Sequence, residues 1–338
     1  MTARERSPAA PLIIDGLDTS RWGVRSVYEG LRAGRVTAIN ATVAIWDDYV
    51  SALDNIKRWY RYFDDFGDLV RPVTTVADID SARREARTGV IFGWQNAAPI
   101  GGDIDRLRLF HRLGVRVIQL TYNERNLLGN GCYERSDEGL SKFGQAVVHE
   151  MNRLGILVDL SHCGDRTTDQ AIDESAQPVA ITHANARTQF AHPRNKPDAT
   201  IRRLAERGGV IGANAFPMFF PGGFDSTLAT YLDAIEYLVQ LAGARHVGIG
   251  TDFCMEQPRE WFEWIFSSQG TVPATSVAST PHPYRHLHGF EGPSKFGALR
   301  EGLVRRRYDD RTIAGILGEN WMRLFGQVWR DAGPEVHR

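Results

Sequence analysis

Short runs of apolar and small residues recur along the chain, and a stretch with helical spacing of its apolar residues follows most of them. Several runs contain almost no polar residue, which is typical of strands buried on both faces of a sheet. Eight runs predict strands: Leu12–Asp15, Val36–Val43, Val90–Trp94, Val115–Thr121, Ile156–Ser161, Val179–His183, Val210–Asn214 and Val247–Asp252.

The segments between these runs predict amphipathic helices. Apolar residues from Val50 to Phe63 and from Phe143 to Leu154 return every three or four positions, and the stretch DATIRRLAERGG ends in a glycine pair suited to a helix stop. Strand–helix alternation predicts a parallel sheet with right-handed crossovers. Eight units favour closure into a (β/α)8 TIM barrel, and the first turn, DGLDTS, lacks the GxGxxG pattern of an open dinucleotide-binding sheet.

One domain accounts for this pattern. Residues 1–10 read as a flexible N-terminal tail, and residues 11–338 read as a single barrel domain. Residues 253–297, after the eighth strand, form a long segment rich in proline and aromatic residues. A segment of this length in a compact domain is typically a lid or a binding loop.

Composition narrows the classes of function. The chain of 338 residues is 42% hydrophobic and 24% charged, and its formal net charge of -1 provides no basic field for nucleic acid or an anionic membrane. The first residues lack the apolar core of a secretion signal, and no run is long enough to span a bilayer. Three cysteines make no disulfide framework, so we expect a cytoplasmic protein with buried free thiols.

Candidate chemistry lies where the strands end, because barrel enzymes place their active sites at the carboxyl ends of the strands. His162 and His183 end the fifth and sixth strands, and Asp252 ends the eighth. Imidazole and carboxylate groups are suitable ligands for a divalent transition metal. Three such groups at one barrel mouth therefore predict a metal site, although a single histidine at such a position is more often structural.

Several motifs at these residues resemble the membrane (renal) dipeptidase family, an amidohydrolase-like group of barrels (peptidase family M19). GLSKFGQAVVHEMNRLGILVDLSH ends at His162, PVAITHANAR contains His183, and HPRNKPD and HVGIGTDF follow. The resemblance extends over about residues 12–329. It implies a (β/α)8 fold with two bridged zinc ions that hydrolyses dipeptides, often with a D-residue on the carboxyl side.

The resemblance also implies roles for individual residues. His162 and His183 match two ligands of the second zinc ion. Asp252 matches the acid that handles the proton of the attacking water, and Arg194 matches the arginine that holds the substrate carboxylate.

The sequence departs from the family pattern at the other ligand positions. Leu17 and Thr19 stand where the family has a His-x-Asp pair, and Gln95 stands where a carboxylate bridges the two ions. Tyr122 replaces a histidine that contacts the substrate. Leucine cannot coordinate a metal, and a neutral amide cannot offset the charge of two dications. We therefore expect one divalent ion, with zinc preferred, on His162 and His183, with Gln95 or Asp252 beside it.

Other polar and aromatic residues near the predicted mouth have two interpretations. The polar ones are either replacement ligands or ordinary hydrogen-bonded and packed residues, and the latter reading is preferred for each. The aromatic ones either pack the lid, which is preferred, or form a cage for a cationic ligand. The polar set is Asp15, Asp18, Glu124, Glu134, Cys163 and Cys254, and the aromatic set is Trp46, Trp94, Tyr122, Trp261, Phe262 and Trp264.

These observations predict a metal-dependent hydrolase of a small amide or dipeptide-like substrate that bears a carboxylate. Two alternatives stay open: a single-metal enzyme of another reaction type on the same barrel, and a pseudoenzyme that only binds a ligand. A purely structural barrel has no need of His162, His183, Arg194 and Asp252 together, which argues against the pseudoenzyme. The expected partner is a small molecule, and the sequence leaves a homodimer open.

Overall fold

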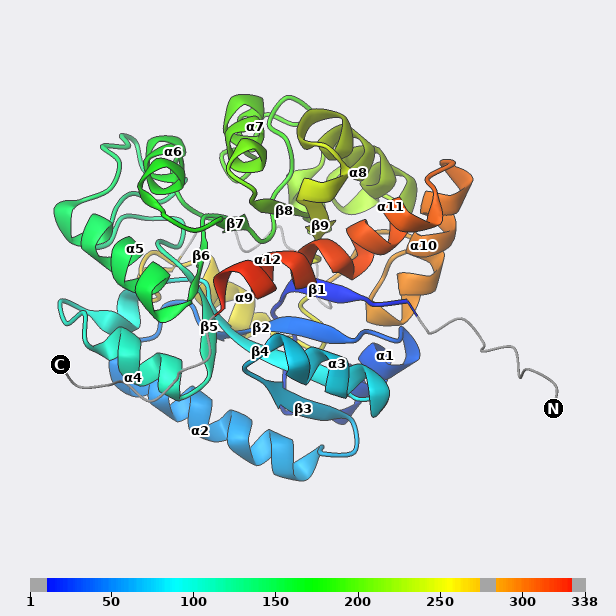
Figure 1. Cartoon of the computed structure of the whole chain (residues 1–338), viewed down its shortest axis with the longest axis horizontal. Helices are drawn as coiled ribbons and strands as arrows, with labels where there is room; N and C mark the ends of the chain where they lie inside the picture. The colour runs from blue at the N-terminus through cyan, green and yellow to red at the C-terminus, as the bar shows by residue number, and fades with distance from the viewer. Residues whose placement is uncertain (1–10, 274–283, 330–338) are drawn as a thin grey trace.

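The computed structural model describes residues 11–273 and 284–329, and these residues form a closed barrel of eight parallel strands surrounded by helices (Figure 1). The first strand pairs with both the second and the last, which closes the sheet. The predicted (β/α)8 fold is therefore confirmed. The barrel strands are β1 (Ile14–Asp18), β2 (Ala38–Ala44), β4 (Thr88–Trp94), β5 (Val115–Gln119), β6 (Leu157–Asp159), β7 (Ala180–Ile181), β8 (Val210–Ala213) and β9 (Val247–Ile249).

Two details of the sheet differ from the prediction. A ninth strand, β3 (Val70–Val73), pairs with the first half of β4, and its short Val-Arg-Pro-Val sequence carries no strand signal because proline is excluded from central strands. The first strand begins at Ile14 and continues to Asp18 instead of stopping at Asp15. Polar residues extend this strand because the Thr251 N–H and hydroxyl satisfy the buried Asp15 carboxylate and the Ser20 N–H donates to one oxygen of Asp18.

The helices lie where the apolar periodicity predicts them. In α2, Asp48 caps the first turn by accepting from the Ser51 N–H, and Ala52, Ile56 and Trp59 face the barrel. The helices are α1 (Arg25–Ala33), α2 (Tyr49–Asp65), α3 (Val76–Arg84), α4 (Arg106–Arg112), α5 (Lys142–Leu154), α6 (Asp165–Glu174), α7 (Asp198–Glu206), α8 (Leu228–Ala242), α9 (Arg259–Ile265), α10 (Phe296–Arg305), α11 (Asp310–Ala314) and α12 (Asn320–Val328).

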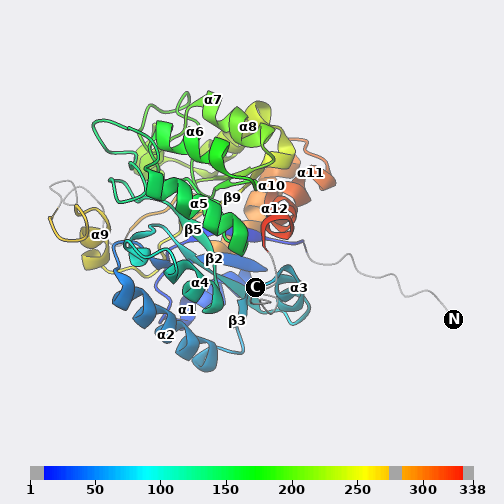
Figure 2. The same cartoon turned by 60° about the vertical axis from the view of Figure 1, so that its left-hand side comes forward.

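Different elements cover the two ends of the barrel. Helix α12 lies across the end where the strands begin, and its Trp321, Leu324 and Phe325 pack against the first residues of the strands. Helix α9 lies at the opposite end, as Figure 2 shows. The barrel mouth at the carboxyl ends of the strands is therefore covered by α9.

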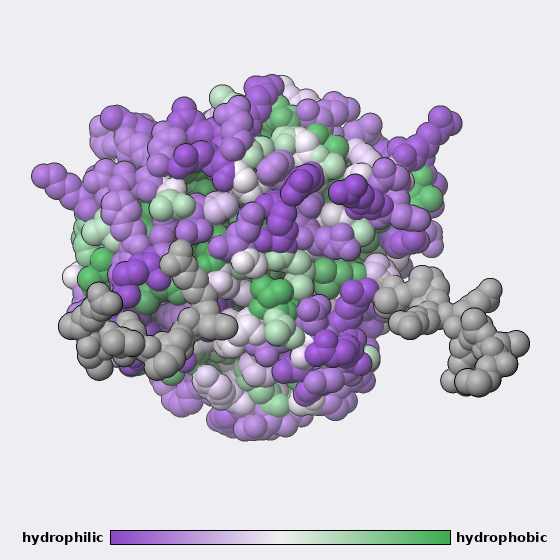
Figure 3. All heavy atoms as spheres, in the orientation of Figure 1, coloured by the Kyte–Doolittle hydropathy of each residue, from purple (hydrophilic) through white to green (hydrophobic). Residues whose placement is uncertain are grey.

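Helix α9 belongs to the segment predicted as a lid, so this segment contains regular structure. Part of the segment, residues 274–283, and the predicted tail, residues 1–10, lie outside the described residues. Within the described ranges, no helix combines the length and apolarity needed to cross a bilayer. On the face drawn in Figure 3, hydrophilic residues separate the apolar residues into small patches.

Candidate functional site

A small cavity lies at the carboxyl ends of the strands, and it brings together most of the predicted site residues. Its walls include Gln95, Tyr122, His162, Arg194 and Asp252, and Phe219 from the β8–α8 connection also lines it. Trp261, Ile265 and Phe266 of the α9 segment cover the cavity. The cavity measures about 30 Å³, which is room for a water molecule or two and not for a dipeptide.

The sixth predicted residue, His183, is in direct contact with His162. The two Nε2 atoms are 2.9 Å apart, and both side chains are almost completely buried. His162 Nδ1 donates to Asn123 Oδ1 at 2.7 Å, and the ring of Tyr122 stacks on the His162 imidazole at 4.2 Å. In neutral His162, the proton is therefore on Nδ1, and Nε2 carries an unprotonated lone pair.

A buried hydroxyl and carboxylate orient His183 in the same way. The Thr182 hydroxyl donates to Asp159 Oδ2 at 2.6 Å, so its oxygen accepts from His183 Nδ1 at 2.8 Å. His183 Nε2 is consequently also unprotonated in the neutral ring. Burial is the main cause that lowers the pKa of both histidines well below the usual value, and Arg194 lowers it further.

Two unprotonated nitrogens 2.9 Å apart repel each other unless a cation lies between them. The low pKa values disfavour a proton, and this separation lies within reach of a single ion whose bonds to nitrogen are about 2.0–2.1 Å long. The Nδ1 contacts to Asn123 and Thr182 are of the kind that orient metal-binding histidines. The donor pair thus fits one divalent metal ion. A third ligand of the predicted type is missing: in the described ranges, no three His, Cys, Asp or Glu side chains gather at metal-binding distance.

Arg194 is a buried cation beside this pair. Its guanidinium donates to the carbonyl oxygens of Ser161 and His183 at 2.6 and 2.9 Å, and it lies over the Phe219 ring. Only 1% of the residue is exposed, and the carboxylate that acts on it electrostatically is Asp252 in the same cavity, with which it makes no direct ion pair. A buried guanidinium without a directly bonded carboxylate carries a desolvation penalty, so this position favours an anionic ligand.

Asp252 is the acid of the cavity. Burial raises the pKa of Asp252 to about 6, and Arg194 and the Asn214 amide, which donates to Oδ2 at 3.3 Å, oppose this rise. Its backbone is in the left-handed region, with φ of 57°, as is that of Asn123. Non-glycine residues adopt this region at a free-energy cost, and such strain clusters at functional sites.

The residues at the positions that depart from the family pattern are packed or hydrogen-bonded in the structure. The Leu17 side chain is buried, and the Thr19 hydroxyl donates to the Phe253 carbonyl at 2.9 Å. Gln95 donates from Nε2 to Thr42 Oγ1 at 3.0 Å, which leaves its amide oxygen as the one atom able to coordinate.

The six proposed replacement ligands have ordinary structural surroundings, with one exception. Glu124 accepts from Ser268 and Gln269 of the lid segment, and Glu134 accepts from the Arg125 N–H. Cys163 and Cys254 are buried free thiols, and Asp15 accepts from Thr251 and Leu17. Asp18 differs because its Oδ2 is buried without a hydrogen-bond partner.

Sequence analysis did not identify the residues that hold the functional groups in place. Asn123, Asp159, Thr182 and Asn214 orient the two histidines and Asp252. A signal for Asp159 was present, since a carboxylate inside an apolar strand requires buried partners. The other three are uncharged polar residues, which are common at strand ends.

Comparisons with known proteins agree with the fold. A crystal structure of an amidohydrolase from Pseudomonas aeruginosa is 38% identical, with a TM-score of 0.90 over 95% of this chain and 97% of that one. An uncharacterised dipeptidase of Schizosaccharomyces pombe is 31% identical over 73% of this chain and 54% of its own length. Dipeptidase aclJ of Aspergillus oryzae is 30% identical over 83% of this chain and 61% of its own length.

The aligned part of this chain thus spans a little over half of the length of these two curated relatives. The family model described as membrane dipeptidase (peptidase family M19) matches residues 20–264, which include both histidines, Arg194 and Asp252. This match covers well over half of the chain and confirms the resemblance seen in the motifs. The chain belongs to the membrane dipeptidase family, peptidase family M19.

Proposed function

We propose that this chain is a metal-dependent hydrolase of a small amide or dipeptide-like substrate that bears a carboxylate, and that it uses one metal ion. The observation that carries the proposal is the buried Arg194 guanidinium, which makes no direct ion pair with a carboxylate within the described residues and lies beside two unprotonated histidine nitrogens. This arrangement needs an anion and a cation in neighbouring places. A carboxylate substrate and a divalent metal would supply them.

The two histidines would hold the ion through Nε2, with Gln95 or Asp252 beside it. When bound, such an ion polarises the amide carbonyl and lowers the pKa of water to about 7. Leu17 and Thr19 offer no place for a second ion of the usual type. This is why the proposal specifies one ion and not two.

The protein groups would divide the remaining work. Arg194 has further N–H groups beyond the two that bond backbone carbonyls, and these would hold the substrate carboxylate. Asp252, with its pKa near 6, would take the proton from the attacking water and pass it to the leaving amine. The Tyr122 ring keeps the His162 imidazole in position by stacking.

The first prediction concerns metal content. Purified protein should contain close to one divalent ion per chain by elemental analysis, and His162→Ala and His183→Ala should each remove it. His149→Ala is the matched control, because His149 is an exposed histidine on α5 that contacts Glu174. Two ions per chain would contradict the altered site. Unchanged metal content in both site variants would refute the ligand assignment, and no metal at all would favour a ligand-binding pseudoenzyme.

The same preparation should be assayed with a panel of L,L and L,D dipeptides in the presence of zinc, cobalt or manganese. Because the first metal's ligands are absent, we expect turnover of common dipeptides below the usual enzyme range, which begins at about 1 per second. Faster turnover would contradict the altered site and not the family assignment.

A further inference from the structure

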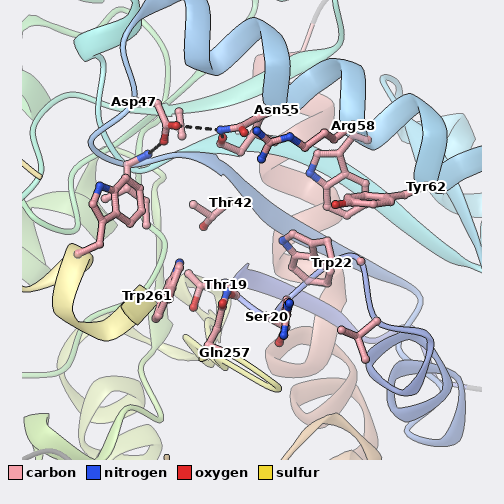
Figure 4. Close-up of a pocket in the computed structure, with 18 residues that line it drawn as sticks. Thr19, Ser20, Trp22, Thr42, Asp47, Asn55, Arg58, Tyr62, Gln257 and Trp261 are labelled. Atoms are coloured by element: carbon pink, nitrogen blue, oxygen red, sulfur yellow. Dashed lines mark hydrogen bonds between the residues drawn. The ribbon is translucent and has the colours of Figure 1, made fainter. Parts of the chain in front are cut away.

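A second, larger cavity adjoins the candidate active site. It measures about 510 Å³ and lies between the loop after β1, residues 55–62 of α2 and the lid helix α9 (Figure 4). Thr19, Ile45 and Trp261 line both cavities, so the two cavities adjoin at these residues. The larger cavity has the volume of a small-molecule site, about 300–1,000 Å³, whereas the active cavity is far below it.

The position of Arg194 determines which end of a substrate faces the second cavity. Arg194 lines only the smaller cavity, and a substrate held there by its carboxylate must extend away from Arg194. A hydrogen bond from Gln95 in the smaller cavity to Thr42 in the larger one also joins the two. The part of the substrate on the amino-terminal side of the scissile bond is therefore the part that can reach the second cavity.

The walls of the second cavity are mainly aromatic. Figure 4 shows Tyr62 of α2 and Trp22 on one side and Trp261 of α9 on the other. Trp22 and Trp59 pack against each other at 5.2 Å, and Tyr62 meets Trp59 edge-on at 5.6 Å. Aromatic rings prefer such offset and edge-on arrangements, so another flat ring can be accommodated among them.

The charged groups of this cavity disfavour a cationic side chain. Two exposed guanidinium groups, Arg21 and Arg58, and one carboxylate, Asp47, line it, which gives a net charge of +1. The Asp47 carboxylate is held by the Ile45 N–H at 3.0 Å and by the Asn55 amide at 2.9 Å. The two guanidinium groups outnumber the single carboxylate, so the lining disfavours a cationic side chain. Of the aromatic residues considered from the sequence as a cage, Trp261 and Trp264 line this cavity.

We infer that this cavity is the subsite for the side chain of the substrate's amino-terminal residue, and that it selects an aromatic side chain and disfavours a cationic one. The inference rests on the proposed function for the position of the substrate carboxylate. It adds the substrate class, a dipeptide-like amide with phenylalanine or a similar residue first. Tyr62 and Arg58 are the residues that determine this specificity, and neither contacts the reacting groups.

Binding, measured apart from turnover, tests the subsite. The probes are Phe-Ala, Leu-Ala, Lys-Ala and Ala-Ala in which the amide nitrogen is methylated to resist hydrolysis, and calorimetry on the purified protein gives their affinities. The Phe analogue should bind about 10-fold more tightly than the Ala analogue. Tyr62→Ala should lower affinity for the Phe analogue about 3–10-fold, as expected for loss of an aromatic contact, and leave the Ala analogue unchanged.

Tyr60→Ala is the matched control, because Tyr60 lies on the same helix, is 49% exposed and does not line the cavity. Equal affinities for all four analogues in the unmodified protein would overturn the subsite. So would an equal loss in the Tyr60 and Tyr62 variants.

A charge substitution provides a second test that does not remove a packed ring. Arg58→Glu changes the lining from a net charge of +1 to -1, so affinity for the Lys analogue should rise about threefold or more. Arg61→Glu makes the same change on α2 outside the cavity and should have a smaller effect. Equal gains in both variants would show a general field effect and would overturn the role of Arg58.

Turnover of unmodified dipeptides separates this inference from the proposed function. If no dipeptide is hydrolysed while the Phe analogue binds in a Tyr62-dependent manner, the subsite stands and the hydrolase proposal fails. If dipeptides are hydrolysed with no preference for the first residue and bind without one, the hydrolase proposal stands and the subsite fails.

Discussion

At the scale of single residues, Arg194 has both a structural and a binding contribution. Its two hydrogen bonds to the carbonyls of Ser161 and His183 hold the loops that carry the histidines. Removing it would leave buried carbonyls unsatisfied, which lowers stability whether or not Arg194 binds substrate. A stability measurement therefore cannot separate the two roles, and a comparison of ligands is needed.

The prediction for Arg194 uses a dipeptide analogue with a free carboxylate and the same analogue with a carboxamide end. Unmodified protein should prefer the carboxylate by about 1.5–3 kcal/mol, the contribution of a hydrogen bond to a charged group. Arg194→Ala should abolish this preference, and Arg194→Lys should restore part of it, because lysine lacks the two-pronged geometry. A preference that survives in Arg194→Ala would mean that another group binds the carboxylate.

Asp252 gives a prediction about pH. Its pKa, raised to about 6 by burial, means that Asp252 loses its proton as the pH rises through this value and only then can accept one. For the fastest substrate of the dipeptide panel, kcat/KM should rise with pH up to about 7 and then level off. Asp252→Asn should lower kcat/KM by about 10²–10⁴-fold and remove this rise.

Asp173→Asn is the control, because Asp173 is an exposed carboxylate paired with Arg203. It should leave the pH profile unchanged. A profile that is flat between pH 5 and 7 in the unmodified protein would contradict the role of Asp252 as the proton acceptor.

At the scale of elements, the two helices at the barrel ends have different tasks. Helix α9 covers the cavities with Trp261 and Ile265, and hydrogen bonds from Ser268 and Gln269 to Glu124 connect its segment to the β5–α5 loop. The proposed function requires the α9 segment to move, because the active cavity is too small for a dipeptide in this arrangement. Helix α12 instead closes the other end with fully buried side chains.

The prediction for α12 concerns Trp321. Its side chain is completely buried, its Nε1 donates to the Ile249 carbonyl at 3.0 Å, and Gly16 and Gly248 leave the space for its ring. Trp321→Ala should lower the free energy of unfolding by about 3–5 kcal/mol, the usual effect of emptying a site of this size. Chemical denaturation, monitored by circular dichroism, measures this change in the free energy of unfolding.

The control for Trp321 is Gln327→Ala, an exposed position on the same helix, which should change stability by less than about 0.5 kcal/mol. Metal content should stay unchanged in a folded Trp321→Phe variant, because α12 lies at the end of the barrel away from the histidines. A similar loss of stability in both alanine variants would mean that the packing of Trp321 does not specifically stabilise the barrel.

At the scale of the whole molecule, the barrel brings distant residues to one place. His162, Arg194 and Asp252 come from loops after β6, β7 and β9, and they line one cavity because parallel strands end at the same face. The second cavity lies on the β1–β2 side of this face. Two neighbouring cavities of different chemistry are what a substrate with a polar and an aromatic end would require.

The sequence alone determined the fold class and the family of this chain. Apolar periodicity fixed the eight barrel strands and helices such as α2 and α5, because burial on one or both faces leaves a repeat of fixed length. The family motifs predicted the membership that the family model confirms, whereas the altered metal site inferred from Leu17, Thr19 and Gln95 stays a prediction. Strand β3 was not predicted because its four residues carry no periodic signal.

Only the tertiary structure decided which polar residues face each other. The 2.9 Å contact of His162 with His183, and the partners Asn123 and Thr182 that set their protonation, depend on the stagger between neighbouring strands. The second cavity exists because α2 and α9, about 200 positions apart in the chain, meet at the barrel mouth. Sequence patterns record whether a residue is buried within its own element, whereas a site depends on distances between elements that only packing determines.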